Sequence, residues 1–337
     1  MKKFLSLMLA SLMMVSVLAG CGGDSEAPAE NGGDAAPVSN EVAKELKFTT
    51  GSTTGTYYGF GTVLAGQISK NTESKVTAVE GKGSKGNVVL MDMGDAQLGF
   101  VQSDVMSYAY NGTNLFADTG KIDNFSTLAS LYMEQVQIVT CDPNIKSVED
   151  LRGKNVSVGE GGSGVFFNAV DVLGAYGMDV EKDINAKYLG FSDSADALKD
   201  GKIDAAFLTA GAPTVAVTEL AAGKETYLVS MDQEHIDALI ETSPYYSAYT
   251  IPADVYSLDE DVHTVAVGAV IIARDDVSEA DAYNVVSGIF ENLDAVAGAH
   301  DKGKELSLEA AASVTSVPYH PGAAKYFTEK GLEVPVK

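Results

Sequence analysis

Short β-prone runs that alternate with helix-like apolar stretches are the dominant pattern of this chain from residue 45 onward. In the first unit, the extended run 47–50 is followed by Gly51, a turn rich in Ser and Thr, and a helix-like stretch from about residue 54 to residue 71. Glycine lets the backbone turn sharply, and Ser and Thr are frequent at helix starts. The free N–H groups of such a helix start suit an anionic group. This unit therefore predicts a strand, a tight turn and a helix whose first turn faces a ligand.

Similar units follow in a first series. It predicts strands at 75–80 and 97–101, helices through 88–93 and 105–110, and a long β-prone segment at 127–140. Asp142-Pro143-Asn144 then marks a turn or a change of domain.

A second series begins after that turn. Its predicted strands lie at 155–158, 188–191, 203–208 and 227–230. Its predicted helices lie at 147–151, from the GEGGSG loop (159–164) to about 176, at 192–200, and after residue 213. Ser147 and Ser192 are the expected N-caps of two of them. The chain then runs extended through 248–252 and 264–273, and helices at 279–299 and 307–312 close it.

This order of elements predicts an α/β fold with two lobes. Short strands that alternate with helices form largely parallel sheets covered on both faces. The long segments 127–140 and 248–273 are the expected crossovers. We therefore expect lobe I at 45–140 and 248–337, and lobe II at 141–247. Ligands of open α/β sheets bind beyond the carboxyl ends of the strands, so the cleft should collect the polar breaks at 51–58, 83–87, 102–104, 161–165 and 209–211.

The N-terminal region has the pattern of an export signal. Residues 1–20 contain two lysines, an apolar core and small residues, as a signal peptide does. The sequence LAGC at 18–21 resembles a bacterial lipobox, which implies cleavage before Cys21 and lipid on its thiol. An ordinary secretory signal and an uncleaved anchor helix are the alternatives. Residues 21–44 are rich in Gly, Ala, Pro and acids, so we expect a disordered acidic tether after the lipidated Cys21.

Composition excludes some partners. The net charge of −24 argues against binding nucleic acid or anionic lipid through a basic face. The only other cysteine is Cys141. If Cys21 carries lipid, no disulfide framework exists, and Cys141 is either a small buried hydrophobe or a reactive thiol.

Sequence motifs for enzymatic chemistry are weak. GKGSKG at 81–86 fits the glycine spacing of a dinucleotide site, but its strand is not the first and an exported protein meets no nicotinamide pool. A polar loop that turns Ser84 and Asn87 toward a small ligand is the favoured interpretation. GEGGSGV at 159–165 lacks the second glycine of a nucleophile elbow, because Val165 stands there.

Other candidate ligands of metals or substrates are few. The four histidines show no metal-ligand spacing and no nearby nucleophile, and no carboxylate or cysteine cluster has metal-ligand spacing. We therefore predict no enzyme, no cofactor and no metal. The only arginines, Arg152 and Arg274, lie in charged turns, so an arginine clamp on a ligand carboxylate is not expected. Helix starts and hydroxyl or amide side chains must hold an anionic ligand, and at least one of Tyr57 and Tyr58 should face the cleft.

Several segments resemble the TAXI family, the solute receptors of tripartite ATP-independent periplasmic (TRAP-type) transporters. The resemblance is carried by TTGSTTGTYYGFG (49–61), LGFVQSDVMSYAYNG (98–112), VSVGEGGSGV (156–165), GKIDAAFLTAGAPT (201–214) and VPYHPGAAKYFTEKG (317–331). It covers nearly all of 45–331 in the right order. It implies a type II periplasmic-binding-protein fold, a membrane permease partner driven by an ion gradient, and a small ligand, with glutamate or glutamine the familiar choice.

The same resemblance implies a set of ligand-binding residues. They are Ser52, Thr53, Tyr57, Ser84, Asn87, Gln102, Ser103, Ser163, Gly164, Val165, Thr209 and Gly211. The family often has further glycines where this chain has Ser52 and Thr54, so the added side chains alter the pocket. The alternatives are an ATP-driven (ABC-type) uptake receptor for an inorganic, phosphorus or nitrogen oxyanion, which shares the fold, and an exported enzyme that uses the same cleft.

Overall fold

The structure is a computed structural model, and it describes residues 41–337. The predicted signal peptide at 1–20, the lipidation at Cys21 and most of the tether lie outside the described residues.

One mixed β-sheet organises the described chain. Its strand order is β2-β1-β3-β10-β4-β7-β5-β6, with β8 paired to β4 and β9 paired to β10. The strands are β1 (Leu46–Thr49), β2 (Val76–Val79), β3 (Leu98–Gln102), β4 (Phe125–Thr140), β5 (Asn155–Ser157), β6 (Asn185–Lys187), β7 (Ala205–Ala210), β8 (Tyr227–Leu228), β9 (Ser247–Ile251) and β10 (Val262–Arg274).

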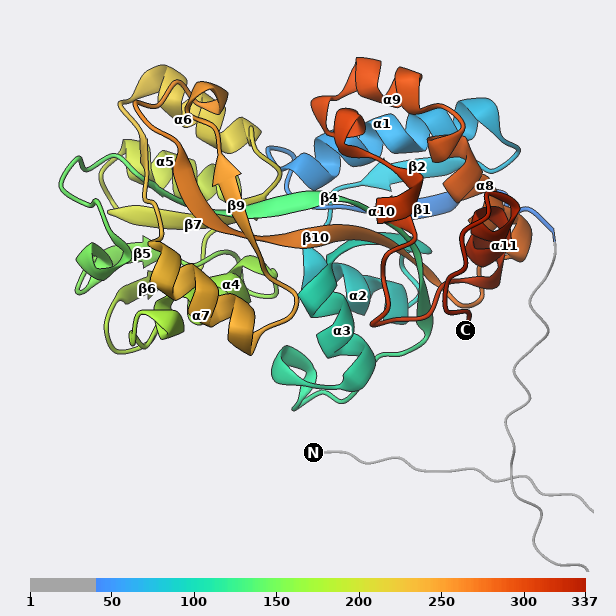
Figure 1. The fold of residues 1–337 in the computed structure, drawn as a ribbon, viewed down its shortest axis with the longest axis horizontal. Helices are drawn as coiled ribbons and strands as arrows, with labels where there is room; N and C mark the ends of the chain where they lie inside the picture. Colours follow the sequence, from blue (N-terminus) through green and yellow to red (C-terminus); the bar gives the residue numbers. More distant parts are fainter. Residues whose placement is uncertain (1–40) are drawn as a thin grey trace, which may run out of the picture. The chain divides into compact units, whose positions relative to one another are not determined.

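The sheet divides into two lobes joined by its two longest strands. Strands β2, β1 and β3 pair in parallel in lobe I, and β6, β5 and β7 pair in parallel in lobe II. Strands β4 and β10 lie between these groups, antiparallel to their neighbours (Figure 1). The predicted two-lobe α/β fold with two crossovers is confirmed. The prediction of a largely parallel sheet holds within each lobe. It is wrong at the crossovers, because β4 runs from lobe I to lobe II and β10 runs back in the opposite direction.

Strand pairing shows where the chain passes from lobe to lobe. In β4, residues 135–140 pair with β7, and in β10, residues 262–266 pair with β9 whereas residues 269–273 pair with β3. The crossovers therefore lie near Glu134 and Gly268, inside continuous strands. The lobe boundaries at residues 140 and 248 stay a prediction.

Helices cover both faces of the sheet in each lobe. The α-helices are α1 (Thr56–Asn71), α2 (Ser84–Asp92), α3 (Ser103–Asn111), α4 (Val165–Ala175), α5 (Phe191–Lys199), α6 (Val215–Gly223), α7 (Gln233–Thr242), α8 (Glu279–Phe290), α9 (Leu293–Ala299), α10 (Leu308–Ala311) and α11 (Pro321–Glu329). Short 3₁₀ helices are η1 (Asn114–Phe116), η2 (Val148–Leu151), η3 (Ala253–Val255) and η4 (Asp301–Glu305).

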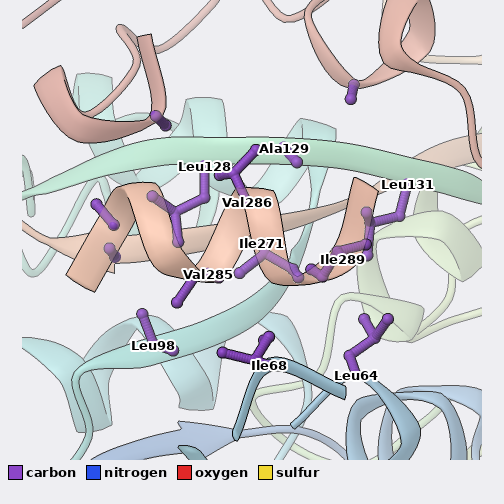
Figure 2. Close-up of a cluster of buried hydrophobic side chains, with 14 of the residues drawn as sticks. Leu64, Ile68, Leu98, Leu128, Ala129, Leu131, Ile271, Val285, Val286 and Ile289 are labelled. Carbon is purple, nitrogen blue, oxygen red and sulfur yellow. The ribbon is translucent and has the colours of Figure 1, made fainter. Parts of the chain in front are cut away.

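Two buried clusters of apolar side chains hold each lobe together. In lobe I, one cluster packs Leu64, Ile68 and Ile289 from helices against Leu128 and Ile271 of the sheet (Figure 2). The opposite face of the same lobe buries a second cluster beneath α2 and α3. Lobe II has a matching pair of clusters. Burial on both faces explains why the short strands read as continuous apolar runs in the sequence.

The structure corrects several predicted elements. The strand predicted at 188–191 is wrong: β6 ends at Lys187, and α5 begins at Phe191 with Gly190 as its N-cap, so Ser192 is not the cap. The helix expected from about residue 54 begins at Thr56, with Gly55 as its N-cap.

Other corrections concern the C-terminal half. The helix predicted at 279–299 is interrupted at Glu291 and Asn292, which separate α8 from α9. Helices α7 and α11 were not predicted, although Asp232 caps the first and Pro321 opens the second, as helix-start rules describe. The cap predicted at Ser147 is confirmed, because Ser147 and Asp150 form a capping box at η2.

Candidate functional site

A cavity lies between the two lobes at the carboxyl ends of the parallel strands. It encloses about 540 Å³ of empty space, counting its opening to solvent. Its walls come from the segments that follow β1, β2, β5 and β6, and from the ends of β3 and β7. The lining residues are Gly51, Ser52, Gly55, Thr56, Tyr57, Lys82, Gly83, Ser84, Gln102, Glu134, Glu160, Ser163, Gly164, Val165, Gly190, Phe191, Thr209 and Ala210.

Four helices begin at this cavity with glycine as the N-cap. These residues are Gly55 before α1, Gly83 before α2, Gly164 before α4 and Gly190 before α5, and none of the four helices has a side-chain cap. A Ser or Asp cap would satisfy one of the free N–H groups of the first turn, whereas glycine leaves them available. The partial positive charges of several helix starts therefore face one space, where they favour an anionic group.

Two hydroxyl groups in the cavity wall have no partner. Ser163 Oγ and Thr209 Oγ1 are buried without a hydrogen bond to any other described residue. Burying an unpaired hydroxyl group is unfavourable, so such groups mark places where a ligand atom supplies the missing bond. Both residues lie in cavity-facing segments, the loop before α4 and the end of β7.

The deep end of the cavity contains a tyrosine and a carboxylate. Tyr57 stacks on Phe100 with 4.5 Å between ring centroids, and its hydroxyl group donates a 2.6 Å hydrogen bond to Glu134 Oε2. Tyr57 lines the cavity, whereas Tyr58 does not. Of the two tyrosines in the first turn of α1, Tyr57 is therefore the one that faces the site.

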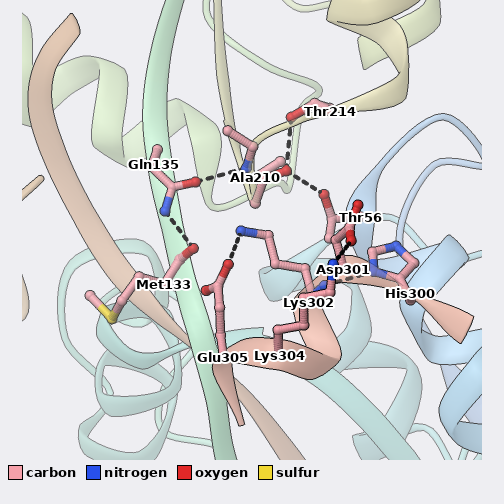
Figure 3. Close-up of polar contacts among 12 residues, drawn as sticks. Thr56, Met133, Gln135, Ala210, Thr214, His300, Asp301, Lys302, Lys304 and Glu305 are labelled. Atoms are coloured by element: carbon pink, nitrogen blue, oxygen red, sulfur yellow. Dashed lines mark hydrogen bonds and ion pairs between the residues drawn. The ribbon is translucent and has the colours of Figure 1, made fainter. Parts of the chain in front are cut away.

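Glu134 is a buried acid at the point where β4 crosses between lobes. Its side chain is nearly inaccessible to solvent, and this burial raises its pKa to about 8, with the Tyr57 hydrogen bond acting in the opposite direction. Lys302 lowers that pKa only slightly, because its ammonium group is bound to Glu305 at 2.6 Å (Figure 3). The protein therefore supplies little positive charge to balance an ionised Glu134.

Closure of the lobes is maintained by hydrogen bonds that cross the cavity. In the interior, Thr56 Oγ1 donates to the Gly211 carbonyl at 2.8 Å, and at the surface Thr54 Oγ1 lies 2.8 Å from Ser192 Oγ. The Gly86 N–H donates to the Gly162 carbonyl at 3.1 Å. These contacts show that the structure represents a closed arrangement of the two lobes.

A buried network behind the cavity also crosses between lobes. Gln102 Nε2 donates to Asn168 Oδ1 at 2.7 Å, and Asn168 Nδ2 donates to Tyr246 Oη at 2.7 Å and contacts Asp104 Oδ2 at 3.3 Å. Tyr246 in turn donates to Asp171 at 2.9 Å. Burial raises the pKa of Asp104 to about 7, and the nearby Asp171 carboxylate acts in the same direction.

The structure brings most of the predicted ligand-binding residues together. Ser52, Tyr57, Ser84, Gln102, Ser163, Gly164, Val165 and Thr209 line the cavity. Ser84 and Gln102 bond to each other, because Ser84 Oγ donates to Gln102 Oε1 at 3.1 Å and accepts from the Gln102 N–H at 3.0 Å.

Four predicted residues lie outside the lining. Thr53 is exposed in the turn before α1. Asn87 is fully buried and bonds to Thr49, to the Thr50 carbonyl and to the Phe100 carbonyl, so its amide joins the strands of lobe I. Ser103 Oγ accepts from the Gly268 N–H, and the Gly211 carbonyl accepts from Thr56.

Sequence reasoning missed several lining residues, above all Glu134. The available signal was one acid within the otherwise β-prone segment 127–140, because a glutamate is rarely buried in a strand unless it has a partner. Lys82, Glu160 and Phe191 were also missed. They lie in loops or at a helix start, where their direction depends on the fold.

Three further features concern the arginines, metal sites and membrane-spanning helices. Neither arginine lines the cavity: Arg152 pairs with Asp183, and Arg274 pairs with Asp276. Within 41–337, no group of His, Cys, Asp and Glu has the arrangement of a metal site. In the same range, no helix combines the length and apolar character needed to cross a membrane.

Two lobes of helix-covered parallel strands enclose a cavity at the carboxyl ends of those strands, which is the arrangement of the two-lobe periplasmic-binding-protein fold. Within it, the chain belongs to the NMT1-like family, whose model matches residues 48–331.

Solved structures share the fold at low sequence identity. A protein from Bordetella bronchiseptica RB50 is 14% identical, with 84% of this chain and 88% of that chain covered and a TM-score of 0.50. The periplasmic aliphatic sulphonate binding protein SsuA from Escherichia coli is 15% identical, with coverage of 86% and 90% and a TM-score of 0.46. An ancestral arginine-binding protein bound to arginine is 19% identical, with coverage of 79% and 100% and a TM-score of 0.49. Likenesses of this degree concern the fold and identify no ligand.

Proposed function

We propose that the protein is the extracytoplasmic solute receptor of a TRAP-type transporter, of the TAXI kind. It closes its lobes on one small carboxylate-bearing solute, of which glutamate and glutamine are the best candidates, and delivers it to a membrane permease. The export signal and the LAGC sequence support a lipid anchor at Cys21 on the outer face of the cell membrane.

The observation that carries this proposal is the convergence of four uncapped helix starts on one inter-lobe cavity. These N–H groups, with the free hydroxyl groups of Ser163 and Thr209, can hold a carboxylate without an arginine. Because the cavity is formed by both lobes, a ligand that contacts both stabilises the closed form. A permease that recognises the closed form would then receive loaded receptors.

A second candidate is an ABC-type receptor for an oxyanion. The same N–H groups also suit a phosphate, sulfate or sulfonate group, so this feature of the cavity does not separate the two candidates. An exported enzyme has less support, because the cavity lining contains neither a histidine nor a cysteine.

The direct test is thermal unfolding of the purified full-length protein against a panel of solutes. The panel contains glutamate, glutamine, aspartate, 2-oxoglutarate, other dicarboxylates, branched amino acids, phosphate and sulfate. The chain has no tryptophan, so circular dichroism or an external dye reports the transition. A ligand at 1,000 times its Kd adds about 4 kcal/mol of stability, which corresponds to several degrees.

The outcomes separate the candidates. A shift with glutamate or glutamine supports the proposal, whereas a shift with inorganic anions alone favours the ABC-type receptor. Chromatography of the incubated solute tests for turnover, and loss of the bound solute to a product would identify an enzyme.

A further inference from the structure

Glu134 presents one free carboxyl oxygen to the cavity. The residue is 2% exposed and lines the cavity wall, and its Oε2 accepts the Tyr57 hydroxyl proton at 2.6 Å. Among the contacts of residues 41–337, no hydrogen bond or ion pair is formed by Oε1. An ionised carboxylate in such a place is costly unless a cation accompanies it.

The cations of the described chain near this carboxylate do not bind it. Lys302 lowers the pKa of Glu134 through its positive charge. Its ammonium group, however, is bound to Glu305 at 2.6 Å and lies 5.6 Å from the centroid of the Tyr132 ring. Lys82 lines the same cavity without forming an ion pair to Glu134. A cation that balances an ionised Glu134 would therefore have to come from the ligand.

We propose that Glu134 binds the ammonium group of a zwitterionic solute whose carboxylate lies at the helix starts, so that the receptor selects α-amino acids with uncharged side chains, such as glutamine, over dicarboxylates. This assignment rests on the proposed function and narrows its ligand.

The charges of the cavity support this choice. Its wall contains one lysine, Lys82, and two carboxylates, Glu134 and Glu160, and it contains no arginine. A zwitterion matches Glu134 with its ammonium group and the helix N–H groups with its carboxylate. A dicarboxylate such as glutamate brings a second negative charge for which only Lys82 is present. An uncharged amide side chain can instead bond to free hydroxyl groups such as Ser163 and Thr209.

The first test compares four probes by titration calorimetry on the full-length protein: L-glutamine, its deaminated analogue glutaramate, L-glutamate and glutarate. Removing one partner of a buried charge pair costs enough that glutamine should bind about 30-fold or more tighter than glutaramate. Glutamate should bind more weakly than glutamine.

The second test removes the carboxylate. Glu134→Gln keeps an oxygen acceptor for Tyr57 and should weaken glutamine binding by about 30-fold or more, with little change for glutaramate. Glu219→Gln, an exposed carboxylate on α6, is the matched control and should bind as the wild type does.

A third test needs no variant and covers the case in which Glu134→Gln fails to fold. Burial holds the pKa of Glu134 at about 8, so the empty site carries a proton at pH 7 that an incoming ammonium group displaces. The charged and titratable groups that act on Glu134 are Tyr57 of α1, Asp104 of α3, Tyr132 of β4 and Lys302 of η4, and Lys302 is paired with Glu305. Calorimetry at pH 7 in imidazole and Tris, two cationic buffers that differ in protonation enthalpy, should show proton release with glutamine and none with glutaramate.

These results distinguish the two levels of the proposal. If none of the four probes binds, glutamate and glutamine are excluded as the solute, and the proposed function fails at its best candidates. If glutaramate or glutarate binds as tightly as glutamine, or glutamine binds without proton release, the receptor function stands and the role of Glu134 is overturned.

Discussion

At the scale of single residues, unpaired polar groups identify the ligand site most directly. Ser163 Oγ and Thr209 Oγ1 are buried in the cavity wall and have no partner among residues 41–337. Most buried hydroxyl groups of folded proteins are hydrogen-bonded. The closed lobes therefore leave specific bonds for a solute to complete.

Replacement of Ser163 tests this at one atom. Ser163→Ala should weaken binding of the solute found in the panel by about 1–3 kcal/mol, because a buried ligand oxygen would lose its donor. Calorimetric affinity is the measurement. Ser287→Ala on α8, far from the cavity lining, is the control and should leave the affinity unchanged. Equal affinities of Ser163→Ala and wild type would remove Ser163 from the site.

Residue-level prediction from the sequence succeeded where a local signal existed. Hydroxyl and glycine residues directly after predicted strands, such as Ser52, Ser84 and Ser163, do line the cavity. Asn87 has the same local signal, but its amide bonds to Thr49, Thr50 and Phe100, contacts that only the folded sheet creates. Glu134 stands out in the sequence as the one acid of its β-prone segment, but its role depends on which face of β4 turns to the cavity.

At the scale of elements, the glycine N-caps hold the helix starts close to each other. Gly164 is the clearest case: a Cβ atom there would lie 1.4 Å from Gln102 Oε1 and 2.5 Å from Gln102 Cδ. Gln102 cannot simply move away, because Ser84 and Asn168 bind its amide. The absence of a side chain at Gly164 is therefore a requirement of lobe closure.

Gly164→Ala should consequently prevent full closure. We expect solute affinity to fall by about tenfold or more, since the network from Ser84 through Gln102 to Asn168 would break. Gly161→Ala, in the same loop, has no atom within 4 Å of the new Cβ and serves as the matched control. Calorimetry and small-angle scattering with saturating solute measure affinity and closure. A Gly164→Ala protein that closes and binds normally would contradict this account.

Element prediction from the sequence was reliable where periodicity and caps agreed. The units around β1 and α1 and around β7 and α6 were found with boundaries shifted by a few residues. The wrong strand prediction at 188–191 arose from the apolar sequence YLGF. In the structure, Phe191 begins α5 and lines the cavity. Whether such a short segment forms a strand depends on the strand with which it can pair, and a single sequence does not reveal that partner.

At the scale of the whole molecule, two buried carboxylates lie where the lobes meet. Glu134 is at the β4 crossover and Asp104 is in the first turn of α3, facing Asn168 and Asp171 of α4. Burial raises the pKa of Glu134 from 4.5 to about 8 and that of Asp104 from 3.8 to about 7. Burial therefore favours the protonated form of both acids in the empty protein, and a bound cation would favour the ionised form of Glu134.

This arrangement predicts a pH dependence of stability with a defined sign. Between pH 4.5 and 8, folded Glu134 retains a proton that the unfolded chain has released. The folded state binds more protons in that window, so the Glu134 contribution to the free energy of unfolding falls as pH rises, by up to about 1.4 kcal/mol per pH unit. In Glu134→Gln this contribution is absent. The stability of the variant relative to wild type should thus increase from pH 5 to pH 8 in the absence of solute.

Urea unfolding of both proteins at pH 5, 6, 7 and 8 measures that difference. Subtracting the wild-type value at each pH cancels the titration of all groups that the two proteins share. Glu219→Gln should show no such trend, because its carboxylate is exposed. Saturating glutamine should reduce the fall of wild-type stability with rising pH, since binding of an ammonium group favours the ionised carboxylate. A constant difference between Glu134→Gln and wild type across this range would mean that Glu134 is ionised in the empty receptor, with its charge balanced by the protein itself.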